Sequence, residues 1–281
     1  MPESRTGTIV AVLSCIAGFV AIAIAVVVPE VRQIIGLDPP AAVGKPPSEP
    51  PASGPGAAVA SIQKEVDKAL DLGVKAYEEK RFLDAERQYL KALDLDPNEP
   101  RAHFYLGNLL KAQKRYVDAE QSFNKAIKLS PDYVDAINSL GLTYFALERY
   151  DEAIAQYLSA IRIKPDFVKP YVNLGIAYRI KNRYSDAIDQ FTQAIRINPN
   201  YSDAYLNLGN VYFAQRLYQQ AVEMFKKTVN LSPSDVDAHY ALGLAYLGIS
   251  DRSAAQSQYQ ILNDLDPKVA QALLQKIQAS P

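Results

Sequence analysis

The sequence contains few of the side chains that most often carry chemistry. Its 281 residues include one cysteine, two histidines, two methionines and no tryptophan. The single cysteine, Cys15, excludes an internal disulfide and lies inside a long apolar run. Because a thiol nucleophile must be accessible, cysteine chemistry is disfavoured. We therefore expect a protein that is not an enzyme and that needs no cofactor or metal.

Neither sign of charge dominates the sequence. Thirty basic and 31 acidic side chains give a net charge of −1. Because proteins that bind the phosphate backbone present a basic surface, nucleic acid is not an expected partner. A glycine-rich loop that could hold phosphates is also missing from the sequence.

The dominant feature is a repeat of 34 residues that runs without insertion or deletion from Val66 to Val269. Its six copies are residues 66–99, 100–133, 134–167, 168–201, 202–235 and 236–269. A period of this length is typical of a solenoid, in which each unit packs on its neighbours. We number the residues of each copy from 1 to 34.

Five positions keep their residue type in all six copies, among them leucine at position 7 and alanine at position 20. Position 8 is always glycine: Gly73, Gly107, Gly141, Gly175, Gly209 and Gly243. Position 24 is always aromatic: Tyr89, Phe123, Tyr157, Phe191, Phe225 and Tyr259. Position 32 is always proline: Pro97, Pro131, Pro165, Pro199, Pro233 and Pro267.

These positions predict two packed helices in each copy. Positions 4, 7, 8 and 11 share one face of a first helix, A, and positions 20, 24 and 27 share one face of a second helix, B. Small residues at 8 and 20 allow a close approach, and proline at 32 ends helix B. We expect polar residues at position 33 to cap the next helix A. They are Asn98, Asp132, Asp166, Asn200 and Ser234.

The 34-residue pattern resembles the tetratricopeptide repeat (TPR) family. The resemblance covers all six copies, although position 4, often tryptophan in the family, is never tryptophan here. It implies an all-α, right-handed superhelical solenoid with a concave groove lined by helix A. Val269, Leu273 and Ile277 then share one face of a C-terminal capping helix at 268–278, which completes a TPR domain at 59–281.

The segment before the repeats predicts a membrane anchor. After a short tail (1–7), residues 8–29 form an uncharged apolar stretch long enough to span a bilayer as one transmembrane helix. A cleaved signal peptide is the alternative, but its apolar core is normally shorter, about 7–15 residues. Residues 30–58 form a juxtamembrane segment and a proline-rich linker.

The side of the membrane on which the repeats lie is not specified, because basic residues flank the apolar stretch on both sides without a clear excess. Cys15 is read as a small apolar residue within the membrane, with a lipidated cysteine as the alternative. The layout is similar to membrane-bound TPR assembly factors, which suggests a thylakoid or a bacterial inner membrane. The sequence does not determine the oligomeric state.

The resemblance places positions 2, 5, 6, 9, 12 and 13 in the groove, where residues vary more between copies than in the core. Amides there can pair with a peptide backbone, and apolar and charged residues can add specificity. Phe145 and Phe213 are expected to be exposed. The predicted protein-binding residues are Asn108, Lys111, Asn138, Phe145, Lys169, Asn173, Arg179, Asn207, Asn210, Phe213 and Tyr240.

Other polar residues receive structural interpretations. His103 and His239 both lie at position 4, a packing position, four repeats apart. A row of arginines at position 16 marks the turn between helices A and B, either as a solvated edge or as a contact for anionic partners: Arg81, Arg115, Arg149 and Arg183. The residues that grip acidic chaperone tails in some TPR proteins are matched only by Asn108 and Lys169.

The sequence therefore predicts a membrane-anchored, non-enzymatic scaffold that binds partner proteins or peptides in its groove. Assembly or biogenesis of a membrane protein complex is the expected setting. The alternative is a groove that carries a small apolar ligand, a pigment or a lipid.

Overall fold

The computed structural model describes residues 56–280, and within this range all regular secondary structure is α-helical. The helices are α2 (Gly56–Glu78), α3 (Phe82–Leu95), α4 (Pro100–Ala112), α5 (Tyr116–Leu129), α6 (Val134–Ala146), α7 (Tyr150–Ile163), α8 (Val168–Ile180), α9 (Tyr184–Ile197), α10 (Ser202–Ala214), α11 (Tyr218–Leu231), α12 (Val236–Gly248), α13 (Arg252–Leu265) and α14 (Pro267–Ala279).

The predicted anchor at 8–29 and nearly all of the proline-rich linker lie outside the described residues. From residue 56 to residue 280, no helix is both long enough and apolar enough to span a membrane.

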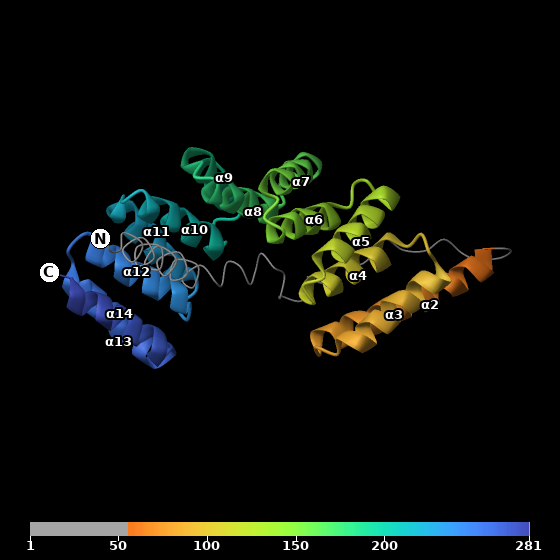
Figure 1. Ribbon diagram of the computed structural model, residues 1–281, viewed down its shortest axis with the longest axis horizontal. Helices are drawn as coiled ribbons and strands as arrows, with labels where there is room; N and C mark the ends of the chain where they lie inside the picture. The colour runs from red at the N-terminus through yellow and green to blue at the C-terminus, as the bar shows by residue number, and fades with distance from the viewer. Residues whose placement is uncertain (1–55, 281) are drawn as a thin grey trace, which may run out of the picture.

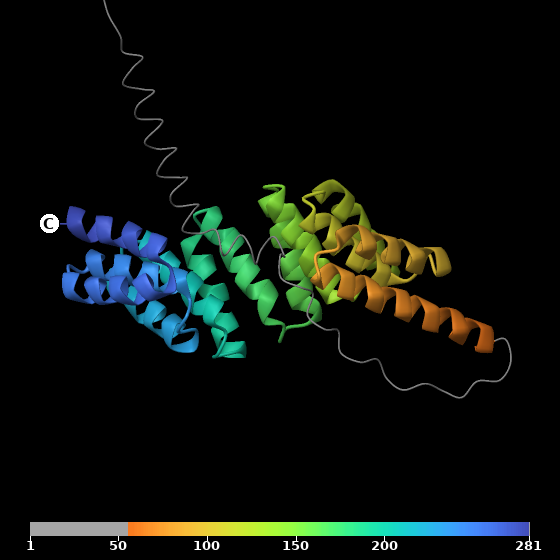
Figure 2. The same ribbon diagram turned by 90° about the horizontal axis from the view of Figure 1, so that it is seen from below.

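The helices form six antiparallel pairs, one for each 34-residue copy, and stack into a curved solenoid (Figure 1). Even-numbered helices α2 to α12 are the A helices, and odd-numbered helices α3 to α13 are the B helices. Each A helix also contacts the A helix of the next repeat. The view in Figure 2 confirms that the pairs follow one another along a single elongated body. The A helices thus lie on the inner side of the curve, where neighbours approach most closely.

The core follows the predicted pattern, in which small residues at positions 8 and 20 lie beside an aromatic ring at position 24. The alanines at position 20 have no exposed surface, and Phe123, Tyr157, Phe191 and Phe225 at position 24 are likewise fully buried. In repeats one to five, a side chain added to the position-8 glycine would meet the position-24 ring of the same repeat. The absence of a Cβ therefore lets the ring lie directly against helix A.

Repeat six departs from this pattern. There a Cβ on Gly243 would meet Leu273 of α14, and Tyr259 at position 24 is only partly buried. Leu273 and Ile277 of α14 are buried with Leu262 of α13. The last helix therefore covers the apolar end of the solenoid and takes the place of a further repeat.

Every A helix ends in the same turn. Position 15 has a positive φ of 58° to 63° in all six repeats, although none of these residues is glycine: Lys80, Lys114, Glu148, Asn182, Arg216 and Ser250. The amide of the next residue donates to a carbonyl five residues earlier, as Arg149 does to Tyr144 at 2.9 Å. This bond and the one from Glu148 to Phe145 define a Schellman motif, which turns the chain toward helix B.

The predicted caps at position 33 are wrong. Position 34 is the N-cap instead, and only Glu99 and Asp235 supply a side-chain bond to the following helix. At Tyr133, Phe167 and Tyr201 no side chain caps the helix. Asn98 uses its backbone amide to bind Asp96 Oδ1 (2.9 Å), one residue too early to cap α4.

Candidate protein-binding groove

The concave groove is the face formed by positions 2, 5, 6, 9, 12 and 13 of the A helices. The predicted residues occupy it to different depths. Lys169 is exposed, and Asn108, Phe145, Asn173, Arg179, Asn210 and Phe213 are partly buried. The remaining four are buried: Lys111, Asn138, Asn207 and Tyr240. A partner could therefore contact the seven exposed or partly buried side chains directly. It could contact the four buried ones only at atoms left accessible between the helices.

The apolar groove residues are less exposed than the sequence suggested. Phe145 and Phe213 are partly buried, because each packs edge-on against the tyrosine at position 17 of its own repeat. The ring centroids are 5.2 Å apart for Phe145 and Tyr150 and 5.3 Å apart for Phe213 and Tyr218. These rings thus stabilise the turn between helices, and only part of each remains for a partner.

The amides of the groove are partly engaged within the protein. Asn173 of α8 donates to Asn138 Oδ1 of α6 at 2.9 Å, which joins two successive A helices. Asn207 donates to the backbone carbonyl of Asp203, and its own Oδ1 is buried without a partner among the described residues. Asn108, one turn before the buried Lys111 on α4, is a partly exposed amide of the groove.

Lys111, at position 12 of α4, is the most unusual groove residue. Only 2% of it is exposed, and its ammonium lies 5.9 Å from the centre of the Phe123 ring. No carboxylate among residues 56–280 forms an ion pair with it. Burial, and to a lesser extent the positive charge of Lys169, together lower the pKa of Lys111 to about 8.

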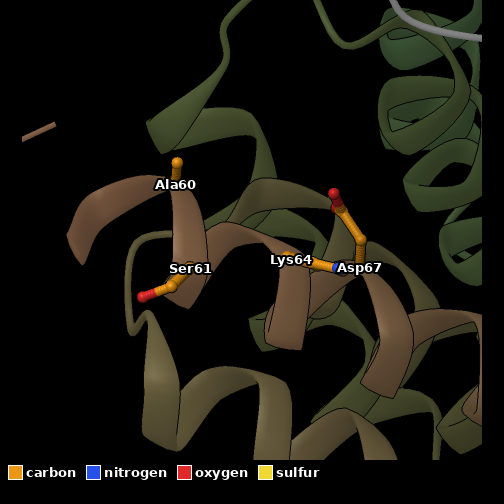
Figure 3. A pocket seen from close by; sticks show the side chains of 4 residues that line it. All are labelled: Ala60, Ser61, Lys64 and Asp67. Atoms are coloured by element: carbon orange, nitrogen blue, oxygen red, sulfur yellow. The ribbon is translucent and has the colours of Figure 1, made fainter. Parts of the chain in front are cut away.

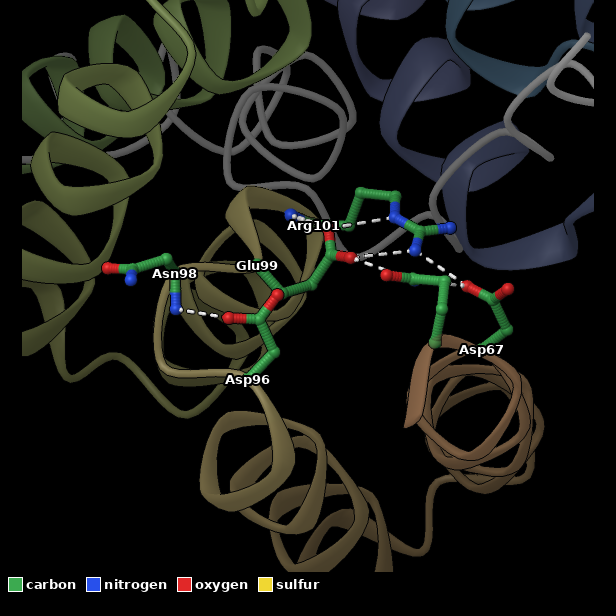
Figure 4. Close-up of polar contacts among 6 residues, drawn as sticks. Asp67, Asp96, Asn98, Glu99 and Arg101 are labelled. Atoms are coloured by element: carbon green, nitrogen blue, oxygen red, sulfur yellow. Dashed lines mark hydrogen bonds and ion pairs between the residues drawn. The ribbon is translucent and has the colours of Figure 1, made fainter. Parts of the chain in front are cut away.

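A network of charges closes the first end of the groove (Figure 4). Arg101 of α4 pairs with Asp67 of α2 at 2.6 Å and with the buried Glu99 at 2.7 Å. Burial alone would raise the pKa of Glu99, but the hydrogen bonds from Arg101 prevail and lower it. Glu99 was not among the residues predicted from the sequence, although its place directly before Pro100 at the start of a helix was an available signal.

The row of arginines at position 16 is satisfied within the protein. Arg149 pairs with Glu120 of the preceding repeat (3.0 Å) and with Glu152 of its own repeat (2.9 Å). It also stacks over Tyr144, with 4.4 Å between the guanidinium and the ring centre. Arg115 pairs in the same way with Glu86 and Asp118. Arg115 and Arg149 therefore join successive repeats, and Arg81 and Arg183 pair within their own repeats, which favours the structural interpretation over an anion contact.

The two histidines also have structural contacts. His103 Nε2 lies 3.0 Å from the carbonyl oxygen of Pro97, and His239 Nε2 lies 2.9 Å from that of Pro233. Tyr171 donates to Pro165 in the equivalent place. In repeats two, four and six, position 4 thus ties helix A to the proline that follows the preceding helix B.

A shallow hollow near the start of α2 is lined by Ala60, Ser61, Lys64 and Asp67 (Figure 3). Two of its four lining residues are charged. A site for a pigment or lipid would be enclosed and mostly apolar, so this hollow does not support the carrier alternative.

Family models described as TPR repeat match residues 141–179 and 175–215, and others described as tetratricopeptide repeat match 70–134, 122–155 and 202–235. Together they cover residues 70–235 without a gap. The chain therefore belongs to the tetratricopeptide repeat family.

Similar folds occur in several solved structures. PilF of Pseudomonas aeruginosa is 20% identical, with a TM-score of 0.67, and the match covers 77% of this chain and 99% of PilF. PilW, described as a type IV pilus biogenesis factor, is 18% identical, with a TM-score of 0.69 over 74% of this chain and 98% of PilW. YrrB, described as having an unusual peptide-binding site, is 21% identical, with a TM-score of 0.51 over 66% of this chain and 97% of YrrB. These likenesses show the fold alone. The curated proteins offer no match to this chain.

Proposed function

We propose that this chain is a membrane-anchored, non-enzymatic scaffold that binds an extended segment of a partner protein along its concave groove. The observation that carries the proposal is the continuous inner face of the A helices, which joins partly buried amides and rings to the exposed Lys169. Such a mixture suits a peptide or a partner helix, because backbone pairing and side-chain pockets occur together.

We propose further that the setting is the assembly or biogenesis of a membrane protein complex. PilW is described as a pilus biogenesis factor, and YrrB as a peptide-binding TPR protein. An anchor at 8–29 in a bacterial inner or thylakoid membrane would confine the groove near membrane partners and raise their effective concentration. Nucleic acid is not an expected partner of this nearly neutral chain.

The test is co-purification of the full chain from membranes solubilised in mild detergent. The groove variant is Asn108→Ala/Lys169→Glu, because both side chains reach the groove surface. The matched control is Gln121→Ala/Lys125→Glu, which removes an amide and reverses a lysine's charge in the same way at exposed positions of α5, on the opposite side of the repeat. Far-UV circular dichroism checks that both variants stay helical.

A defined set of proteins that is retained by the control but lost by the groove variant supports the scaffold. Equal recovery with both variants would place binding on another surface and overturn the role of the groove. Enrichment of a pigment or lipid without any protein would favour the carrier alternative.

A further inference from the structure

The outer surface of repeats one and two carries exposed aliphatic side chains at a position that is polar in the other repeats. Leu83 of α3 is 77% exposed and Val117 of α5 is 60% exposed, and both occupy position 18. Leu90, two turns further along α3, is 46% exposed. Repeats three to six have polar residues at position 18: Asp151, Ser185, Gln219 and Ser253. A lone exposed leucine needs no explanation, but the same exposure in two adjacent repeats indicates a shared role.

A lysine lies three residues before each of these aliphatic side chains. Position 15 is Lys80 in repeat one and Lys114 in repeat two, and both are exposed. Neither forms an ion pair with residues 56–280. Lysine at position 15 and an aliphatic residue at position 18 occur together only in repeats one and two. We call these residues the outer patch: Lys80, Leu83, Leu90, Lys114 and Val117.

The two halves of the outer patch lie side by side. Arg115, in the turn before α5, donates to Glu86 of α3 at 3.5 Å, which brings the turn of repeat two against the first turns of α3. Because α3 and α5 are B helices, the patch lies on the outer side of the curve, away from the groove.

The lysines supply the uncompensated charge of the patch. Arg81 and Arg115 of the same turns already pair with carboxylates. Glu78 is the one exposed acid of these two turns without an ion pair among residues 56–280, and it occupies position 13, on the groove side. The outer patch therefore combines aliphatic side chains with free positive charge.

A phospholipid surface with anionic headgroups fits this combination. Interfacial segments place aliphatic side chains at the boundary between headgroups and acyl chains, and lysines beside them reach the headgroups. A second copy of the chain is disfavoured, because a two-fold contact would bring lysines against lysines. A protein interface normally centres on aromatic or arginine anchors, which the patch does not contain. We propose that the outer patch docks the solenoid onto a phospholipid surface with anionic headgroups.

The proposal goes beyond the proposed function, and it rests on the predicted anchor only for bringing the patch close to lipid. Residues 30–55 separate the predicted span from α2, and an extended chain of this length reaches up to about 80 Å. The turn that holds Lys80 follows the far end of α2, whose 23 residues extend roughly 35 Å. The linker is therefore long enough for the patch to meet the bilayer. Docked in this way, the solenoid turns its groove away from the lipid and toward partner segments.

The test uses the full chain reconstituted into phosphatidylcholine vesicles, with or without phosphatidylglycerol. In a Cys15→Ser background, a single cysteine at position 18 carries a polarity-sensitive fluorophore. Leu83→Cys and Val117→Cys place the label in the patch, and Ser185→Cys and Gln219→Cys place it at the equivalent exposed positions of repeats four and five. Nitroxide-labelled lipid quenches a label that contacts the bilayer.

Charge variants test the role of the lysines. Lys80→Glu/Lys114→Glu reverses both charges of the patch, and Arg216→Glu/Lys227→Glu makes the same change in charge at exposed positions of repeat five. Glutamate is compatible with position 15, since Glu148 occupies it in repeat three with φ of 59°. Far-UV circular dichroism checks that all variants stay helical.

We expect lipid to quench the labels of the patch at least about threefold more than those of repeats four and five, and more strongly when phosphatidylglycerol is present. High salt or Lys80→Glu/Lys114→Glu should weaken quenching at Val117→Cys at least about twofold, because the attraction to the headgroups is screened or lost. Arg216→Glu/Lys227→Glu should leave it unchanged.

The proposal is overturned if the patch labels are as accessible to water as the control labels, or if neither phosphatidylglycerol nor the lysine variant changes their quenching. It is also overturned if a photo-crosslinker at Leu83→Cys joins a second copy instead of lipid. Extraction with alkaline carbonate tests the anchor separately. A chain that resists extraction with its patch labels in water refutes the docking alone, and a chain that is extracted although its patch labels contacted lipid refutes the anchor alone.

Discussion

At the scale of single residues, the fold depends on a glycine facing an aromatic ring. Gly175 of α8 lies where an added Cβ would come within 2.6 Å of Phe191 Cε1. Phe191 is fully buried, so its ring cannot move aside without disturbing the neighbouring helices. The recurrence of glycine at position 8 is therefore a packing requirement, and its cost in helix propensity is offset by the buried ring.

We predict that Gly175→Ala destabilises the protein by about 1–3 kcal/mol, since overpacking outweighs the gain in helix propensity. Chemical denaturation monitored by circular dichroism measures the change. The double variant Gly175→Ala/Phe191→Leu should lose less stability than the sum of its single changes, because the smaller side chain makes room for the methyl group. Additive losses would show that the contact is not the cause.

Lys111 makes stability depend on pH in an unusual range. Its pKa in the folded protein is lowered to about 8, chiefly by burial, from its ordinary value of 10.5. Between these values the unfolded chain binds more protons than the folded one, so stability rises with pH. Below about pH 8 the lysine is charged in both states, and its burial carries the full cost.

We predict that Lys111→Met stabilises the protein at pH 7 by roughly 3 kcal/mol at most, and that this advantage shrinks between about pH 8 and 10.5. Thermal melting of both proteins across this range gives the measurement. Only the difference in thermal stability between the two proteins is compared, because tyrosines also titrate near the upper end of this pH range. A constant difference would mean that the ammonium is not buried as described.

At the scale of the helices, the turn after each helix A holds a residue in the left-handed region without using glycine. Glu148 has φ of 59° and Asn182 has φ of 58°. This conformation costs a residue with a Cβ about 1–2 kcal/mol, although asparagine tolerates it better than most. The arginine at position 16 helps to hold the turn, through its carboxylate pairs and its stacking on Tyr144 or Tyr178.

Glycine at position 15, where φ is positive, should therefore stabilise the turn. We predict that Glu148→Gly raises the free energy of unfolding by about 0.5–1 kcal/mol, and that Asn182→Gly gives a smaller gain. Asn182 also accepts a hydrogen bond from Tyr184, which its replacement removes. Urea denaturation of the two variants provides the comparison. An equal or greater gain in stability from Asn182→Gly would show that steric strain at Glu148 does not account for the effect of glycine.

The elements that repeat were predictable, and the features that depend on context were not. Gly175 and Phe191 recur at fixed spacing, so their contact follows from the period alone. The N-caps were misplaced by one residue because polar residues at position 33 matched the usual preference, whereas the helices begin after position 34. The burial of Lys111 was unpredictable from the sequence, since it depends on how α4 packs against α5 and α6 in space. The binding role of the groove residues stays a prediction.

At the scale of the whole molecule, a solenoid is held together by contacts between neighbouring repeats, so its ends are its weak points. The first end is closed by the network of Arg101, Glu99 and Asp67 between α2 and α4. The second end depends on α14, whose Leu273 is fully buried against α12 and α13. Leu273 takes the place beside Gly243 that the ring at position 24 occupies in other repeats.

We predict that Leu273→Asp unfolds α12 to α14 locally while repeats one to five stay folded, because a buried unpaired carboxylate is not tolerated and the damage spreads only between neighbours. Hydrogen exchange with mass spectrometry should show fast exchange confined to residues 236–280. Gln271→Asp, two residues away and exposed, is the control and should exchange like wild type. Fast exchange along the entire solenoid would mean that the six repeats fold as one cooperative unit, and protection of α12 would mean that repeat six is stable without its cap.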